Sequence, residues 1–234
     1  MADQKHSMVT RFALSQRIEH LLLIVSFSML CLTGLPQKYH QVAWGQALLS
    51  FLGGVRTAQT LHHLFAAMFL FEGVYHAAVV AFELIFARHK PLGMLPGLQD
   101  VKDGLGSVAY LLGLRKEGPR YDRYDFKQKV EYWAMIWGTF SMGITGLILL
   151  FPIIATRLLP GVAVPAAKIL HGYEAVLAFL AIITWHFYNA HLAHGVFPLD
   201  TSIFTGKVPL ERVKEEHPKE YERLMAEKGG ASDA

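Results

Sequence analysis

Several histidines of this 234-residue chain lie in apolar stretches, where an ionisable side chain is least expected. Five of the twelve histidines lie in apolar stretches long enough to cross a membrane, namely His20, His62, His76, His171 and His186. An ionisable side chain in hydrocarbon is costly, so it marks a functional site by default. Neutral imidazole is also the most common metal ligand among side chains. These histidines therefore indicate metal binding inside a membrane.

The spacing of the histidines narrows that chemistry. His62 and His76 are fourteen residues apart, and His171 and His186 are fifteen apart. Fourteen residues is nearly four helical turns, so both members of a pair face roughly the same way, about 21 Å apart along the axis. One histidine of each pair then lies near each leaflet. Paired histidines at two depths predict two haem irons, one above the other across the bilayer.

Composition limits how such a cofactor could be held. Cys31 is the single cysteine, which excludes an intrachain disulfide, an all-cysteine iron–sulfur cluster and a C-x-x-C-H haem attachment. Any haem is therefore non-covalent and held by histidine or methionine. The net charge is only +3 and no basic cluster interleaves with aromatic residues, so nucleic acid is not an expected partner. The polar first ten residues do not lead into a short apolar core with a cleavage site, so no removed signal peptide is expected.

Four apolar segments must position the histidines. The chain is 53% hydrophobic and 18% charged, with a mean hydropathy of +0.30, which is more apolar than a typical soluble domain. Segments long enough to cross about 30 Å of hydrocarbon run over about residues 13–35, 58–86, 129–152 and 164–196. We therefore expect an all-α integral membrane protein, with a four-transmembrane-helix bundle in residues 1–210.

The segments outside the spans are predicted to be helical or mobile. The connection between spans two and three is too long for a bare loop. Its residues 97–114 predict a short amphipathic helix at the cytoplasmic interface. Residues 211–234 are highly charged and predict a cytoplasmic tail, either a solvated helix or a mobile segment.

The distribution of positive charge predicts the orientation. Eighteen of the 22 lysines and arginines lie in the N-terminal segment, the 2–3 connection and the tail, which places both termini in the cytoplasm. This order puts His62 and His171 near the outer leaflet, and His20, His76 and His186 near the inner one. An iron with two imidazole ligands needs one histidine from each of two helices at equal depth. The outer pair is then His62 with His171, and the inner pair is His186 with either His20 or His76.

Other residues near these depths could contact a haem. Arg17 lies one turn before His20, and Arg56 shortly precedes His62. Each could bind a haem propionate or simply anchor the flank of a span. Spans one and three also share a pattern, FSM followed by TGL, at residues 27–35 and 140–147. The small residues of this pattern permit close helix packing, or a flat macrocycle against the backbone.

Several short motifs occur in an order and at spacings that resemble a known family. They are RIEH at 17–20, TG at 33–34, LH at 61–62, YDFKQK at 124–129, YW at 132–133, LH at 170–171, WHFY at 185–188, GK at 206–207 and EHPKEY at 216–221. Over nearly its whole length the chain resembles the di-haem cytochrome b (gamma) subunit of respiratory formate dehydrogenases. Relatives of that subunit occur in nickel–iron hydrogenases and thiosulfate reductases.

The resemblance implies two haem b groups with axial ligands on spans one, two and four. Carried over to this chain, the ligands are His20 with His186 for the cytoplasmic haem and His62 with His171 for the outer haem. The fourteen- and fifteen-residue spacings also resemble the cytochrome b6 type, in which spans two and four supply all four ligands. His76 therefore stays open as the alternative to His20.

The resemblance also implies a quinone site beside the cytoplasmic haem, just before span three. It falls on Asp125, Lys127 and Gln128. Asp125 stands where the family pattern has an amide, and Lys127 where it has a small residue. These departures leave the quinone, menaquinone or ubiquinone, undetermined.

The function implied by the resemblance is electron transfer across the inner (cytoplasmic) membrane of a prokaryote, between a partner redox subunit and the quinone pool. The partner would be an iron–sulfur or cytochrome c electron-transfer subunit, with a larger catalytic subunit. Quinone would react at this subunit, and the sequence leaves the direction of electron flow open. The alternative is a haem-free, proton-coupled transporter or structural anchor with a histidine relay, for which Glu72 and Glu174 supply carboxylates inside the spans.

Overall fold

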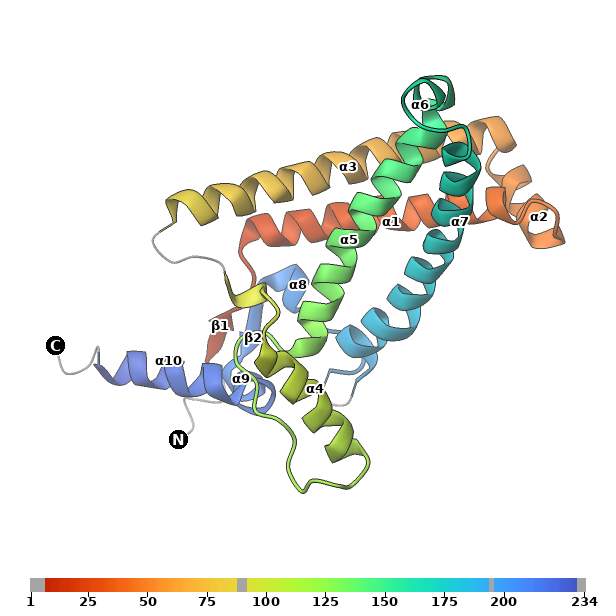
Figure 1. The fold of residues 1–234 in the computed structure, drawn as a ribbon. Helices are drawn as coiled ribbons and strands as arrows, with labels where there is room; N and C mark the ends of the chain where they lie inside the picture. Colours follow the sequence, from red (N-terminus) through yellow and green to blue (C-terminus); the bar gives the residue numbers. More distant parts are fainter. Residues whose placement is uncertain (1–6, 88–91, 194–195, 231–234) are drawn as a thin grey trace. The chain divides into compact units, whose positions relative to one another are not determined.

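The computed structural model describes residues 7–87, 92–193 and 196–230, and these residues are almost entirely helical (Figure 1). Four helical segments are long and apolar enough to cross a membrane, as predicted. They are α1 (Leu14–Lys38), α3 (Val55–Phe86), α5 (Phe126–Leu150) and the continuous segment Ala163–Leu192. The fourth segment comprises α7 (Ala163–Ala181) and two π-helical turns, η3 (Ile182–His186) and η4 (Tyr188–Leu192). The predicted all-α fold class is confirmed.

Burial in these helices is the reverse of what a soluble protein shows. Ser26 and Thr33 are fully buried, whereas Phe71 is 70% and Leu177 is 68% exposed. Large apolar side chains face outward where lipid is the solvent, while small and hydroxyl-bearing residues line the contacts between helices. The chain is a multi-pass membrane protein.

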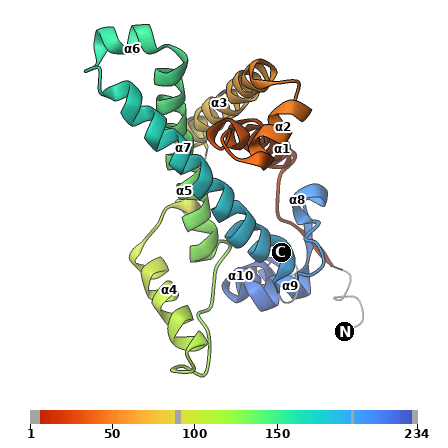
Figure 2. The same cartoon turned by 90° about the vertical axis from the view of Figure 1, so that its right-hand side faces the viewer.

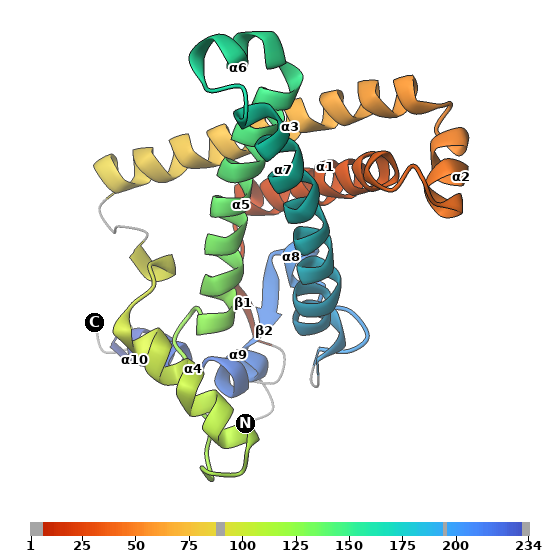
Figure 3. The same ribbon diagram turned by 45° about the vertical axis from the view of Figure 1, so that its right-hand side comes forward.

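The described residues form two compact units. One of them, which we call the membrane unit, contains residues 15–82 and 135–200. Figures 1 and 3 show α1 and α3 running side by side, joined by the short helix α2 (Ala43–Phe51). In the same unit α6 (Pro152–Leu158) joins α5 to α7. Neither α2 nor α6 was among the predicted elements.

The other unit, which we call the polar unit, contains residues 1–14, 83–134 and 201–234. Strand β1 (Met8–Thr10) pairs antiparallel with β2 (Lys207–Pro209), with Val9 opposite Val208. The 3₁₀ turn η2 (Leu92–Met94) precedes α4 (Leu98–Leu111), which confirms the helix predicted in the 2–3 connection. The chain ends in α8 (Ser202–Thr205), α9 (Leu210–Glu216) and α10 (Pro218–Gly230) (Figure 2).

The start of α5 is set by a reciprocal cap that the prediction missed. The Gln128 N–H donates to Asp125 Oδ1 (2.8 Å), and the Asp125 N–H donates to Gln128 Oε1 (3.1 Å). Such a capping box satisfies two backbone donors that a helix terminus would otherwise leave unpaired. The helix therefore begins at Phe126, three residues before the predicted start.

The charged C-terminal segment, predicted to be a solvated helix or a mobile tail, is helical in α9 and α10, and some of its residues are buried. Glu220 is only 2% exposed and binds two arginines, Arg11 Nη1 at 2.6 Å and Arg123 Nη1 at 2.8 Å. His217 Nδ1 donates to the carbonyl oxygen of Asp122 (2.6 Å), and its Nε2 accepts from Arg11 Nη2 (3.1 Å). Burial, and then the Arg11 charge, lower the pKa of His217 below its usual value. The segment is thus tied to the rest of the polar unit.

Candidate functional site

Two pairs of histidines meet between helices of the membrane unit. The ring centroids of His62 (α3) and His171 (α7) lie 6.3 Å apart, with their planes at 74°. Those of His20 (α1) and His186 (η3) lie 6.1 Å apart, with their planes at 40°. A metal ion between two imidazole nitrogens holds the ring centres about 6 Å apart, because each metal–nitrogen bond is about 2 Å long. The spacing of both pairs fits one metal ion between two rings.

A threonine hydroxyl orients each ring of the His62–His171 pair. Thr33 Oγ1 lies 3.0 Å from His62 Nδ1, and Thr145 Oγ1 lies 3.0 Å from His171 Nδ1. Each hydroxyl donates its hydrogen to the backbone carbonyl four residues earlier, at 2.7 and 2.8 Å. The hydroxyl oxygen must then accept from Nδ1–H, which leaves the Nε2 lone pair of both rings for a metal.

A glycine after each threonine gives the imidazole its space. A Cβ added to Gly34 would lie 2.9 Å from His62 Cε1, and one added to Gly146 would lie 3.3 Å from His171 Cε1. The Thr-Gly pairs of spans one and three therefore form two equivalent binding positions for an imidazole ring. In each, the threonine hydroxyl accepts a hydrogen bond and the glycine leaves room for the ring. The repeated TGL pattern was the sequence signal for these contacts, although the sequence did not show that they would be made to histidines.

The His20–His186 pair is built differently. His186 ends the π-helical turn η3, in which the Phe187 N–H bonds to the Ile182 carbonyl oxygen. A π turn takes one residue more than an α turn. The step of fifteen residues from His171 to His186 thus gives nearly the rotation of a step of fourteen in a regular helix. His20 Nδ1 is buried without a hydrogen-bond partner in the part of the chain that the structure describes. A buried, unsatisfied nitrogen is costly and fits a ligand from outside the polypeptide.

His76, the alternative to His20, has a different neighbour. Its Nδ1 lies 2.8 Å from Glu19 Oε2, a buried carboxylate on α1. Glu72, one turn earlier on α3, is buried as well. The structure therefore brings the His20 ring next to His186, and it pairs His76 with Glu19.

The remaining predicted site residues have less specific surroundings. Arg17 is half-buried on α1, and Arg56 is exposed in the first turn of α3. Asp125 and Gln128 form the cap of α5, and Lys127 Nζ lies 3.7 Å from Asp125 Oδ2. The three predicted quinone contacts thus stand together in the polar unit, where Asp125 and Gln128 cap a helix terminus.

The number of protein ligands at each histidine pair shows which kind of metal group could bind there. Among the described residues, no three or more histidine, cysteine, aspartate or glutamate side chains gather to hold a metal ion. A structural zinc site takes four protein ligands, which neither histidine pair supplies. Two facing imidazoles instead suit an iron whose four in-plane ligands come from a porphyrin. The fold and the two pairs define a class: helical membrane proteins with two inter-helix bis-histidine sites.

Comparison with known proteins narrows that class. No family model matches the sequence. The chain is 24% identical over 227 residues to the formate dehydrogenase cytochrome b556 subunit of Haemophilus influenzae, which covers 94% of this chain and 85% of that protein. Against the cytochrome b556(Fdn) subunit of the nitrate-inducible formate dehydrogenase of Escherichia coli K12, it is 23% identical over 220 residues, covering 94% and 93%. Against the cytochrome b556(fdo) subunit of the same strain, it is 24% identical over 229 residues, covering 94% and 95%.

The chain is a distant homologue of formate dehydrogenase cytochrome b556 subunits, which confirms the predicted resemblance. This homology suggests a membrane b cytochrome that serves as an electron-transfer subunit.

Proposed function

We propose that the protein is a di-haem b cytochrome that carries electrons across the membrane between a partner redox subunit and the quinone pool. The observation that carries the proposal is the meeting of two histidine pairs between helices, with ring centroids 6.1 and 6.3 Å apart. When bound, haem would supply one-electron chemistry, with two histidines holding each iron. Because both rings of a pair would hold the iron, the site would transfer electrons and not bind a substrate.

The four axial ligands in this proposal are His62 with His171 for the outer haem and His20 with His186 for the cytoplasmic haem. His20 is preferred to His76 because its ring lies 6.1 Å from that of His186, whereas His76 pairs with Glu19. A haem held only by histidines is non-covalent, in keeping with the lack of a C-x-x-C-H motif.

The surrounding structure orients the ligand rings. At the outer pair, hydrogen bonds from Nδ1 keep both rings in one tautomer and raise the basicity of Nε2. At the cytoplasmic pair, the π turn orients His186 while α1 supplies His20. Arg17 and Arg56 are the proposed partners of the haem propionates, through charge-assisted hydrogen bonds.

Quinone and partner subunits complete the proposal. Quinone reactions move protons together with electrons, and the ion pair of Lys127 with Asp125 (3.7 Å) offers exchangeable protons beside Gln128. The relatives are named as subunits of formate dehydrogenase, which supports a catalytic subunit and an iron–sulfur or cytochrome c electron-transfer subunit as partners. The distribution of lysine and arginine supports an inner-membrane protein with both termini in the cytoplasm.

The test is the haem content of single histidine variants of the full chain. Replacing His62 or His171 with alanine should remove one haem, and replacing His20 or His186 should remove the other, as measured by haem-to-protein ratio and reduced-minus-oxidised spectra. His76→Ala is the matched control and should keep both haems.

Two results would count against the proposal. Retention of both haems in the His62→Ala and His171→Ala variants would contradict the ligand assignment. A colourless wild-type protein, expressed with an adequate haem supply, would favour the proton-coupled transporter or anchor instead.

A further inference from the structure

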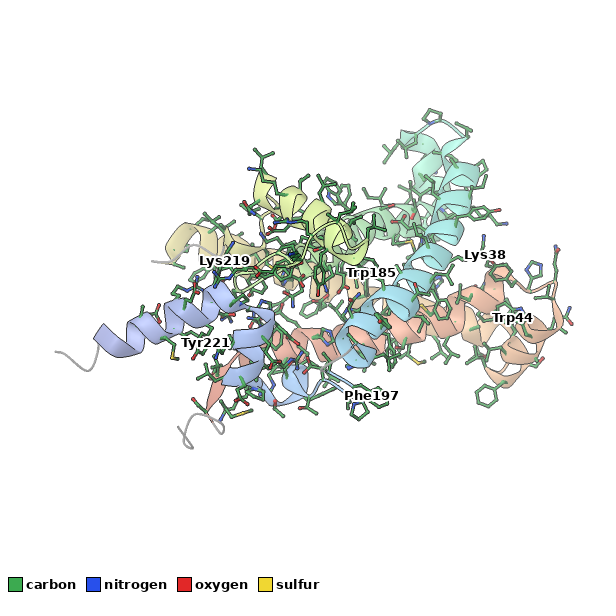
Figure 4. All side chains as sticks on the ribbon, turned by 90° about the horizontal axis from the view of Figure 1, so that it is seen from below. Lys38, Trp44, Trp185, Phe197, Lys219 and Tyr221 are labelled. Carbon is green, nitrogen blue, oxygen red and sulfur yellow. The ribbon has the colours of Figure 1, made fainter. Side chains whose placement is uncertain are left out.

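Lys38 holds its charge beside α7, next to the two residues that follow His171 in the chain. Its Nζ lies 3.8 Å from the ring centroid of Tyr173 and 5.7 Å from that of Tyr39. A Cβ added to Gly172 would lie 3.1 Å from the same Nζ. Figure 4 shows Lys38 at the end of α1, where α1 passes α7. The ammonium group thus contacts the two residues that follow His171 on α7.

The contacts of Lys38 leave part of its hydrogen-bonding capacity unused. An ammonium group has three N–H donors, and an aromatic ring attracts the charge over its face. None of the ion pairs formed within residues 7–87, 92–193 and 196–230 involves Lys38. A lysine that only anchors a helix end extends toward the lipid headgroups. Lys38 instead lies over the ring of Tyr173, which is 66% exposed, so its remaining N–H donors can bind an anion beside α7.

The position of Lys38 on α1 also matches the outer site. Thr33, which binds His62, lies five residues earlier on the same helix, or about 7.5 Å along the axis. Lys38 therefore stands about one and a half turns to the outer side of the histidine pair. Arg56 is exposed in the first turn of α3, and it remains the proposed partner of the other propionate of the outer haem.

We propose that Lys38, positioned by Tyr173, binds a propionate of the haem held by His62 and His171. This inference rests on the proposed function. A fixed positive charge near the iron favours the reduced haem, so Lys38 would raise the reduction potential of the outer haem alone. A lipid phosphate could offer the same anionic chemistry, and the experiment must separate the two.

The experiment is a spectroelectrochemical titration of the full chain in neutral phosphatidylcholine nanodiscs and in nanodiscs with anionic lipid. The outer haem is identified as the one that His62→Ala removes. At its wild-type midpoint, Lys38→Met should lower the ratio of reduced to oxidised outer haem about tenfold, which equals 59 mV for one electron. One unit charge about 10 Å away at an effective dielectric constant of about 20 gives an effect of that size. The inner haem should not change.

Two variants serve as controls. Lys38→Arg keeps the charge and should behave as the wild type. Arg157→Met removes an exposed cation from α6, in the connection predicted to lie on the same side of the membrane, and should leave both potentials unchanged. If Lys38→Met loses the outer haem altogether while Lys38→Arg keeps it, the inference is supported.

The possible failures can be told apart. If the wild type binds no haem, the proposed function fails. If both haems bind and Lys38→Met leaves the outer midpoint unchanged in both lipids, only the role of Lys38 is wrong. A shift seen only with anionic lipid would assign the anion to a headgroup and overturn the inference.

Discussion

If the proposed function is right, removing the hydroxyl of Thr145 should weaken the binding of the haem held by His62 and His171 (the outer haem) more than that of the haem held by His20 and His186 (the inner haem). Thr145 Oγ1 accepts from His171 Nδ1 at 3.0 Å and donates to the backbone at 2.8 Å. Thr145→Val keeps the branched shape but removes the hydroxyl, and with it both this acceptor and the hydrogen bond to the Ser141 carbonyl. His171 is then free to adopt the other tautomer, with its hydrogen on Nε2, and must give up that hydrogen again before it can bind iron.

The size of the loss in haem affinity follows from the hydrogen bond between Thr145 and His171. A buried donor left without its acceptor costs about 1–3 kcal/mol. Loss of one hydrogen bond to a metal-binding imidazole typically lowers metal affinity by about 10–100-fold. We therefore expect the outer haem to bind about 10–100-fold more weakly in Thr145→Val. Its reduction potential should rise, because a less basic imidazole stabilises the oxidised iron less.

The assay is haem titration into the apo-protein, followed by potentiometry of the reconstituted form. Thr145→Ser keeps the hydroxyl and should bind haem nearly as the wild type does, while the inner haem provides an internal reference in every sample. Thr33→Val should have the same effect through His62. Wild-type affinity and potential in both valine variants would refute the argument that these threonines orient the ligands.

Two further changes test other contacts. Gly34→Ala places a Cβ 2.9 Å from His62 Cε1 and should remove the outer haem. Gly161 has open space around it, so Gly161→Ala should keep both haems. Normal haem content in Gly34→Ala would contradict this prediction. Burial and the charge of Arg11 hold the pKa of His217 below its usual 6.5, so the folded polar unit binds fewer protons than the unfolded chain near that pH. Its stability should therefore fall as pH drops below about 6.5. Hydrogen exchange of α10 should show this decline, and His217→Gln should flatten it; an equal pH dependence in the variant would contradict the assignment.

Part of the fold could be predicted because a membrane imposes its requirement on short, contiguous stretches of chain. Crossing the hydrocarbon takes about 20 apolar residues in a row. All four spans were found in this way, to within four residues at each end. The start of α5 was missed because the capping side chains of Asp125 and Gln128 are polar and resemble a loop. The burial of Glu220 was missed because its partners lie far away in sequence.

The candidate site, too, could be predicted only in part from the sequence. Histidines in apolar stretches are visible in the sequence, and helical spacing together with depth was enough to match His62 with His171. It could not separate His20 from His76, since both lie at similar depth. That distinction depends on how α1 and α3 are rotated about their axes and on an extra residue taken up in η3.

By itself, the sequence determined that this is a four-span membrane protein and which histidines are candidates. The tertiary structure alone decided that His20 and not His76 lies next to His186, that the Thr-Gly pairs contact the rings of His62 and His171, and that Lys38 lies beside Tyr173. The reason is physical. Span length and polarity are properties of consecutive residues, whereas contacts between helices depend on rotation and packing among segments that are distant in the chain.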